Sequence, residues 1–424
     1  MIARNPLLRT LAVLALSSWS LSASAISVEV TNPLDQPRNN ELIQIDLEQL
    51  DPSAQVIRGD LAGYRVMRGH ALLPTQLLDH DFDGQPDTLA ILMNLEAGEV
   101  TTLQIEPARS LPNFEKQVHA ELGLRAGHPA AEGDRTGDSG RYILMDHLIR
   151  PTGATSDDFR FEGPLIESRR IAYRIYFDER GAIDIYGKTA DTFVSDAYHR
   201  EQNYHSMQWW GRDLLHNGPA LGLGGLGVGH SAERISPLSA SHVEFMLDAD
   251  GPIYAGFRIL CIDVPFEGND YDVAWDVSIS AGQLALEHRV TVLEGGDLPL
   301  MAALTNHLEE GGVTTRQSIG DPAHHDFLAT WGDQVFPDAN PEAGAQHIEK
   351  MGMAVLWPWL QLDEIESNDL EFRVQFVPGN SVHYHSLAAY NLEGVSPMIT
   401  GYEFYGYLQQ LSRRLAHPVE VELP

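Results

Sequence analysis

The residues with the clearest chemical potential lie between Arg160 and Lys188. The chain has 60 acidic and 28 basic residues, yet six of the basic ones fall in this stretch. Such a gathering of cations in an acidic protein can hold an anion, because a guanidinium grips a carboxylate in a planar, bidentate way. The cations can equally pair with carboxylates that lie close in sequence, at Glu162, Glu167, Asp178, Glu179 and Asp184.

Strand alternation sorts this stretch into a polar and an apolar face. A hairpin with its turn at Asp178–Gly181 would bring the polar faces of two strands together. Tyr173 falls on the apolar face. The candidate ligand-binding groups near the polar faces are Glu167, Arg170, Arg174, Tyr176, Asp184 and Lys188.

A second constellation begins at Tyr204-His205 and continues through Trp209 and Trp210 to Asp213. Aromatic rings stack on sugar faces, and an imidazole beside them can exchange protons near neutral pH. We expect a helix over Met207–Leu215 that presents these groups, with Trp210 and Asp213 as candidate binding residues. The alternative interpretation is a buried aromatic helix without a ligand.

These segments carry a family resemblance. The matching pieces are EGP at 162–164, AYRIYFDERGAIDIYGK at 172–188, YH at 204–205, WGRDLL at 210–215, ALGLGG at 220–225 and ATWGDQ at 329–334. With them the chain resembles a family of exported bacterial proteins classed as a domain of unknown function. Members often accompany enzymes that degrade pectin, rhamnogalacturonan and other uronate polysaccharides. The resemblance implies a large β-sandwich of the sugar-mutarotase type and a role in processing acidic sugars, although Trp209 stands where the family pattern tends to have an acidic residue.

If the ligand is a uronic acid, the chemistry to expect is β-elimination or dehydration. A cation on the carboxylate lowers the cost of the enolate-like charge that develops when the C5 proton leaves. Arg174 and Lys188 would neutralise the carboxylate, His205 would act as base, and Tyr173 or Tyr204 as acid. This chemistry requires no cofactor, and its partner is an acidic oligosaccharide.

Two other functions remain open. A glycoside hydrolase needs two carboxylates at a suitable separation, which Glu167, Asp184 and Asp213 could supply. A non-catalytic periplasmic sugar-binding protein would use the same aromatic and basic groups without a base. Replacement of His205 separates these functions, because only the elimination chemistry depends on it.

Two further motifs suggest metals. The run DHDFDGQPD offers Asp79, Asp81, Asp83 and Asp87 as oxygen ligands for structural calcium, although it lacks the later glutamate of a full EF-hand. His383 and His385 share one strand face and could bind a metal, with further ligands that the sequence does not identify.

The glycine run Gly222–Gly227 matches G-x-G-x-x-G but lies in the middle of the chain. A dinucleotide-binding fold needs this run directly after a first strand, at the start of a helix. A tight loop that packs closely against a sheet or ligand is the better interpretation.

The elements that must position these residues are mostly strands. Alternating or β-branched runs recur from Ser27–Val30 to Phe372–Phe376, punctuated by turn-forming clusters. The helical patterns are few, with Gly401–Leu415 the clearest. We therefore expect a small N-terminal β domain over residues 26–130 and a large antiparallel β-sandwich over residues 131–424 that carries the sugar site.

The N-terminus is typical of an export signal. Arg4 and Arg9 precede the apolar run LAVLALSSWSL, and Ala23-Ser24-Ala25 forms a small-residue cleavage site. We expect cleavage near Ala25 and a periplasmic or secreted protein. The net charge of −32 argues against nucleic acid or an anionic membrane as partner, because phosphates would be repelled. With Cys261 as the only cysteine, no intramolecular disulfide can form.

Overall fold

The computed structural model describes residues 25–50, 63–199, 202–215, 217–230, 233–306, 312–317, 322–334, 349–392, 394–395, 397–398 and 400–424. The expected signal segment 1–25 lies outside these residues except for its last position. The described chain is mostly β, in antiparallel sheets, which confirms the fold class expected from the sequence. Its α-helices are α1 (Leu47–Leu50), α2 (Val194–Ala197) and α3 (Gly401–Ala416).

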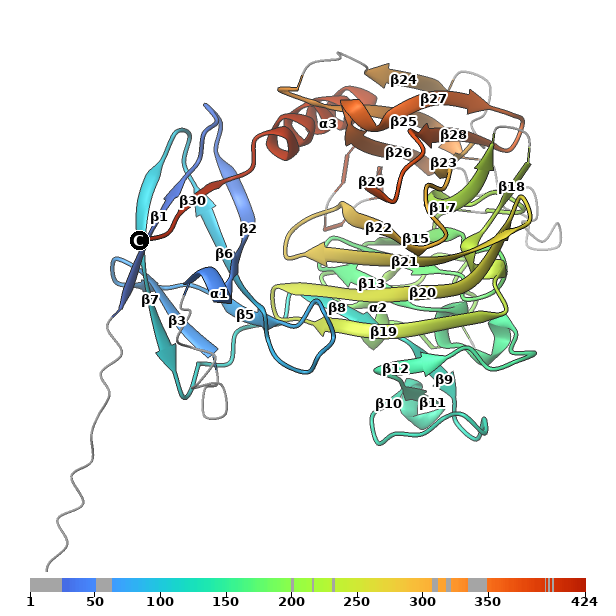
Figure 1. Cartoon of the computed structure of the whole chain (residues 1–424), viewed down its shortest axis with the longest axis horizontal. Helices are drawn as coiled ribbons and strands as arrows, with labels where there is room; N and C mark the ends of the chain where they lie inside the picture. The colour runs from blue at the N-terminus through green and yellow to red at the C-terminus, as the bar shows by residue number, and fades with distance from the viewer. Residues whose placement is uncertain are drawn as a thin grey trace, which may run out of the picture.

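One layer of the sandwich is a nine-stranded sheet. Its strands in spatial order are β12 (His147–Ile149), β19 (His242–Asp250), β20 (Tyr254–Phe266), β21 (Asn269–Ser280), β22 (Leu286–Glu294), β29 (Ser381–Tyr390), β26 (Glu349–Pro358), β25 (His325–Gln334) and β24 (Val313–Gln317). Long hairpins connect β19 through β22, so neighbouring strands in this half are also neighbours in sequence (Figure 1).

The opposite layer consists of two five-stranded sheets. The first contains β16 (Gly211–Asp213), β15 (Ile183–Lys188), β14 (Ile171–Ile175), β13 (Leu165–Ser168) and β8 (Val118–Glu121). The second contains β18 (Glu233–Ile235), β17 (Leu223–His230), β23 (Leu300–Thr305), β28 (Glu371–Phe376) and β27 (Leu362–Ser367). A small sheet of β10 (Thr136–Gly137), β11 (Tyr142–Leu144) and β9 (Gly123–Arg125) lies beside them.

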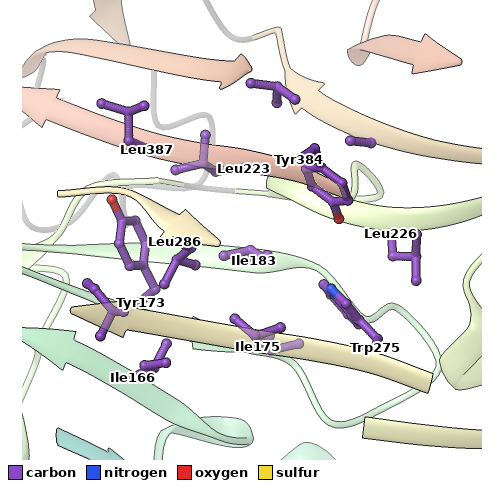
Figure 2. Packing of buried hydrophobic residues seen from close by; sticks show 14 of the residues in the cluster. Ile166, Tyr173, Ile175, Ile183, Leu223, Leu226, Trp275, Leu286, Tyr384 and Leu387 are labelled. Atoms are coloured by element: carbon purple, nitrogen blue, oxygen red, sulfur yellow. The ribbon is translucent and has the colours of Figure 1, made fainter. Parts of the chain in front are cut away.

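The core fills the space between these layers. Figure 2 shows Ile175 of β14 and Leu226 of β17 facing the same interior as Trp275 of β21 and Tyr384 of β29. All four are at most 1% exposed. Because side chains alternate along β21, burying Val273, Trp275 and Val277 on this side turns the polar positions of the same strand to the opposite face.

The N-terminal unit is a separate small β structure. Its five-stranded sheet contains β30 (Glu420–Glu422), β1 (Ile26–Thr31), β7 (Val100–Ala108), β3 (Gly63–Arg68) and β4 (Ala71–Leu72). Its three-stranded sheet contains β2 (Arg38–Asp46), β6 (Thr88–Leu95) and β5 (Thr75–Leu78). The boundary expected near residue 130 moves to the segment between β7 and β8, because β8 pairs with β13 of the sandwich. The chain also returns at its end, where α3 leads into β30 beside β1 (Figure 1).

The helix expected at Gly401–Leu415 is confirmed as α3. It begins with a capping box, in which the Thr400 hydroxyl accepts from the Glu403 amide at 3.2 Å. Phe404, Leu408 and Leu411 follow at helical spacing and are buried against the sandwich.

The helix expected at Met207–Leu215 is wrong. The segment is a turn followed by the short strand β16, with Trp209 64% exposed and Trp210 buried. The two rings lie in the turn that precedes β16, and Gly211, the first residue of the strand, has φ +135°. A β-carbon at Gly211 would lie 1.8 Å from the Gly187 carbonyl oxygen, so the close strand contact requires glycine.

The tight loop expected at the glycine run is instead mostly strand, because residues 223–227 lie in β17 and only Gly222, at φ +76°, precedes it. A β-carbon at Gly222 would lie 1.9 Å from the carbonyl oxygen of Ile183, which bridges the two five-stranded sheets at this point. The run opens strand β17 and not a helix, so the dinucleotide-binding pattern is not met, and the close packing expected at this point is present.

Candidate functional site

The outer face of the nine-stranded sheet carries two rows of polar side chains. The register places Arg258 opposite Asp276, Asp276 opposite Arg289, and Arg289 opposite His383. The next row along the strands holds Ser278, Glu287 and His385. Four adjacent strands therefore turn a set of ionisable groups toward one side.

Hydrogen bonds link the members of these rows. Nε of Arg258 donates to Asp276 at 2.6 Å, and Nε of Arg289 donates to Glu287 at 2.9 Å. Nε2 of His383 lies 3.0 Å from the same Glu287 oxygen, Oε1. Glu287 is thus the centre of the arrangement, with a cation on one side and an imidazole on the other.

The N-terminal unit and α3 wall this face into a groove, which we call the sheet-face groove. It consists of three adjoining cavities of about 190, 320 and 580 Å³. The first two share Gln44, Tyr254, Ser278, Glu287 and Arg289. The second and third share Gln283, Leu411 and Arg414. The cavities of about 320 and 580 Å³ each exceed the roughly 300 Å³ at which small-molecule sites begin.

Arginines line the groove from one end to the other. Arg258 and Arg289 lie in the first cavity, Arg414 in the second, and Arg170 in the third. The Arg289 side chain is 58% exposed, compared with 26% for Arg258 and 19% for Arg414. Arg414 is bound to Glu41 of the N-terminal unit. Arg289 is the most exposed of these three guanidiniums and the best placed to meet a ligand.

The environment fixes the protonation of the central groups. Burial opposes ionisation of Glu287, but the hydrogen bond from His383 and the charge of Arg289 prevail and hold its pKa well below the usual value. Burial lowers the pKa of His385 to about 3 and that of His325 to about 4. At neutral pH the carboxylate is therefore ionised, and both buried imidazoles are neutral.

A further polar group lies at the other side of Arg289. Nδ1 of His80, from the loop after β5, lies 3.0 Å from Asp248 of β19, whose Oδ2 also accepts from the Tyr254 hydroxyl at 3.1 Å. Burial would lower the pKa of His80, but the bond to Asp248 raises it. The positive charge of Arg289 acts in the opposite direction and lowers the pKa of His80. The groove therefore combines an exposed cation with an imidazole, a carboxylate and a hydroxyl.

Sequence reasoning found only part of this groove. It singled out His383, His385 and Arg170 but missed Glu287 and Arg289. Charges inside strand-like runs were the available signal, at Glu287-His288-Arg289 within Ala285–Leu293. Alternation buries His288 completely between its two charged neighbours, which both turn to the groove.

The predicted site on β14 and β15 forms a different structure, the Arg174 cluster. Arg174 pairs in register with Asp184, as the hairpin prediction required, and its Nη2 donates to that carboxylate at 2.6 Å. Asp213 lies 3.3 Å from the same nitrogen, and Glu162 lies 3.3 Å from Nη1. Tyr176 also accepts a hydrogen bond from Arg174 at 2.6 Å.

The structure also brings the predicted base and acid to this cluster. Nδ1 of His205 lies 3.5 Å from Asp213, and the Tyr204 and His205 ring centroids are 4.4 Å apart. Arg174 is only 1% exposed, however, and three carboxylates already surround it. Burial, followed by the charge of Asp184, raises the pKa of Asp213 well above its usual value. This is the pattern of a closed ion cluster, in which the cation already has its partners.

Lys188 and Glu167 form a second closed pair. The Lys188 ammonium donates to Glu167 at 2.6 Å and to the Ser168 carbonyl at 2.6 Å, and both side chains are completely buried. Glu167 also accepts from the amides of Val194 and Ser195 at the start of α2. Neither group lines a cavity of the sheet-face groove, so the predicted substrate contacts of Lys188 and Glu167 are replaced by contacts within the protein.

Tyr173 and Trp210 are also buried within the protein. The Tyr173 hydroxyl donates to the Leu284 carbonyl at 2.7 Å and accepts from the Ala388 amide at 3.0 Å, in the core on the opposite face of β14 from Arg174. Trp210 is fully buried, with its ring centroid 6.0 Å from that of Tyr186. The role of Tyr173 as acid is therefore withdrawn on geometric grounds.

The acidic loop gathers part of its predicted calcium ligands. Carboxylate oxygens of Asp79, Asp81 and Asp87 lie within 4.8 Å of one another, whereas Asp83 is not part of this group. Asp79 accepts from the Gly84 amide at 2.8 Å, and Asp83 accepts from the Gln85 amide at 2.7 Å. Calcium binding by this loop stays a prediction.

The fold and groove define a two-unit β protein with a long, charged cleft over its largest sheet. Residues 30–421 match a family described as a domain of unknown function (DUF4861), and the chain belongs to this family. A comparison with curated proteins finds no match. Among the described residues, no helix is long and apolar enough to cross a membrane.

Two solved structures with similar architecture come from Enterococcus faecalis. One is a protein in glycosyl hydrolase family 38, with a TM-score of 0.48 and 11% identity over 95% of this chain and 48% of that chain. The other is an α-mannosidase from strain V583, with a TM-score of 0.46 and 10% identity over 94% of this chain and 46% of that chain. The present chain thus spans about half the length of each.

Proposed function

We propose that this is an exported carbohydrate-active protein that binds uronate oligosaccharides in the sheet-face groove. The observation that carries the proposal is the exposed Arg289, held by Glu287 between the His383 and His80 groups in the middle of the groove. A guanidinium with free donors binds a carboxylate more strongly than it binds neutral hydroxyls. This moves the proposed site away from the Arg174 cluster.

The proposed reaction is β-elimination or dehydration. With the uronate carboxylate on Arg289, charge that develops as the C5 proton leaves is stabilised by the cation. His80, oriented by Asp248, is the proposed base, and the Tyr254 hydroxyl is the proposed proton donor to the departing oxygen. Elimination of a glycosidic oxygen makes the protein a lyase, and elimination of water from an unsaturated sugar makes it a dehydratase.

The shape of the groove favours an oligosaccharide over a single sugar. The cavity of about 580 Å³ beyond the centre is lined by Arg170 and Arg414 together with the amides Asn39 and Asn40. A second acidic residue could place its carboxylate there, about one cavity away from Arg289. The hydrolase alternative has less support, because two of its carboxylates, Glu167 and Asp184, are completely buried and bound to cations.

The test is to incubate the mature protein with saturated and unsaturated uronate oligosaccharides and to follow C4–C5 double-bond absorbance together with mass. New absorbance identifies a lyase, and lost absorbance with loss of one water identifies a dehydratase. Lost absorbance with gain of one water identifies a hydrolase and overturns the proposed reaction. Binding without any change identifies a sugar-binding protein.

Variants locate the activity. Arg289→Met should lower the affinity for uronates, while Arg316→Met, which removes an exposed arginine from β24 of the same sheet, should not. His80→Gln should lower turnover and spare binding. If His205→Gln abolishes turnover and His80→Gln does not, the Arg174 cluster is the active site and the groove proposal fails.

A further inference from the structure

We propose that Glu287, His383 and His385 form a binding site for a divalent transition-metal ion in the middle of the sheet-face groove. One potential ligand atom from each of the three side chains lies within 4.8 Å of the other two. The inference stands on these side chains alone and does not depend on which sugar the groove accepts.

The sheet geometry imposes this convergence. His383 and His385 are two residues apart on β29, so their rings share a face, and the register places Glu287 of β22 opposite His385. Glu287 Oε1 and His383 Nε2 are 3.0 Å apart, and the His383 and His385 ring centroids are 5.0 Å apart. Ligands around a tetrahedral zinc at ~2.0–2.1 Å lie roughly 3.3 Å from one another, so only small side-chain rotations separate the present arrangement from coordination.

A simple ion pair does not account for His385. It is 8% exposed, and its Nδ1 has no hydrogen-bond partner among the described residues. A buried polar atom without a partner destabilises the fold, whereas a neutral imidazole nitrogen is the commonest protein ligand for such metals. His325 of β25, 6.4 Å away ring to ring, also has an unsatisfied Nδ1 and lines the same cavity.

The donor set selects the class of metal. Two imidazoles and one carboxylate match zinc sites that keep an open position, and also the facial triad of non-haem iron. Calcium and magnesium prefer oxygen ligands throughout and do not suit two imidazoles. Glu287 is further oriented by Arg289, whose Nε donates to it, as carboxylate ligands commonly are by a second group. The remaining coordination position would face the cavity of about 320 Å³.

The chain contains a matched control. Glu244 of β19 also contacts two imidazoles, with His242 Nε2 at 2.5 Å and His147 Nε2 at 3.2 Å, but on a more exposed part of the same sheet. His147 is 56% exposed and His242 is 40% exposed. If a glutamate beside two histidines were sufficient for metal binding, both clusters would bind the ion equally well.

The mature protein is first stripped of metal with a chelator and then dialysed against zinc. The bound zinc is measured by elemental mass spectrometry. We expect one tightly bound zinc per chain, and at least a tenfold weaker affinity in Glu287→Gln and in His383→Gln. His147→Gln should bind as the wild type does. Circular dichroism of each variant checks the fold, and Glu287→Gln preserves side-chain volume if His383→Gln proves unstable.

Cobalt provides a second readout. Cobalt bound by two imidazoles and a carboxylate should give a visible absorption band that Glu287→Gln abolishes. The inference is overturned if the stripped protein binds no zinc, or if binding survives Glu287→Gln and is lost in His147→Gln. Since no sugar is present in either measurement, a failure here leaves the uronate proposal standing, and failure of that proposal leaves the metal site standing.

Discussion

The protein should lose stability as the pH rises past the ordinary histidine range, because of His119 on β8. Its Nδ1 lies 2.6 Å from Asp250 of β19 and its Nε2 lies 2.9 Å from Glu121. Lys116 Nζ lies 2.8 Å from Nδ1, and Arg160 binds Glu121 at 2.8 Å. Both cations therefore disfavour protonation of His119. Burial also opposes it, yet the two carboxylates prevail and raise the pKa of His119 to about 9.

The size and sign of the effect follow from linkage. The folded pKa of about 9 exceeds the reference value of 6.5, so the stabilisation is fully present below 6.5 and is lost as the pH rises through 9. At ~1.36 kcal/mol per pKa unit, the imidazolium contributes roughly 3 kcal/mol at low pH. His119 is 8% exposed, so solvent screening removes little of this contribution.

The assay is denaturant unfolding at several pH values below 6.5 and above 9. Tryptophan fluorescence reports on the sandwich, since every tryptophan after the signal segment lies between Trp209 and Trp359. Over this interval the wild type should lose about 3 kcal/mol more than His119→Gln, in line with the linkage relation. His70→Gln, at an exposed histidine of the N-terminal unit, should follow the wild type. Parallel curves for wild type and His119→Gln would refute the reasoning.

Three further sets of variants test other contacts. Lys188→Met should cost ~3–5 kcal/mol of unfolding free energy by leaving Glu167 buried and unpaired, and adding Glu167→Gln should restore part of the loss. Trp275→Ala should cost ~3–5 kcal/mol by opening a cavity in the core, seen as a lower thermal midpoint. Arg289→Met should weaken binding of uronate oligosaccharides at least tenfold in calorimetry and leave binding of neutral oligosaccharides unchanged; equal losses for both would contradict carboxylate recognition by Arg289.

Local pattern was sufficient to predict the hairpin. The alternation of Arg174 and Tyr176 with apolar neighbours, and a turn at Asp178–Gly181, predicted a strand pair that the structure confirms with Arg174 opposite Asp184. The helix at Gly401–Leu415 could be predicted for the same reason, since Phe404, Leu408 and Leu411 have helical spacing. In both cases the information lies within a few neighbouring residues.

Long-range arrangement was not predictable in this way. The groove is assembled from β2, from the outer face of the adjacent strands β20, β21, β22 and β29, and from α3. These elements are separated by up to hundreds of residues in the sequence. The unit boundary moved for a similar reason, because the pairing of β8 with β13 cannot be read from either strand alone. At Trp209 and Trp210 the error had a local cause, since nine residues that form a turn and a three-residue strand are too few to establish a helical period.

A cation inside a strand needs a partner, and the sequence alone does not show whether that partner is protein or ligand. Arg174 and Arg289 both have protein partners but differ in exposure. Arg174 lies directly opposite Asp184, is 1% exposed, and has its carboxylates supplied by the same sheet and its covering loop. Arg289 is bound to Glu287 at 2.9 Å, yet its side chain is 58% exposed and faces a cavity. Both arginines stand beside carboxylates in sequence, so the charge pattern alone does not separate the closed cluster from the cation that stays exposed.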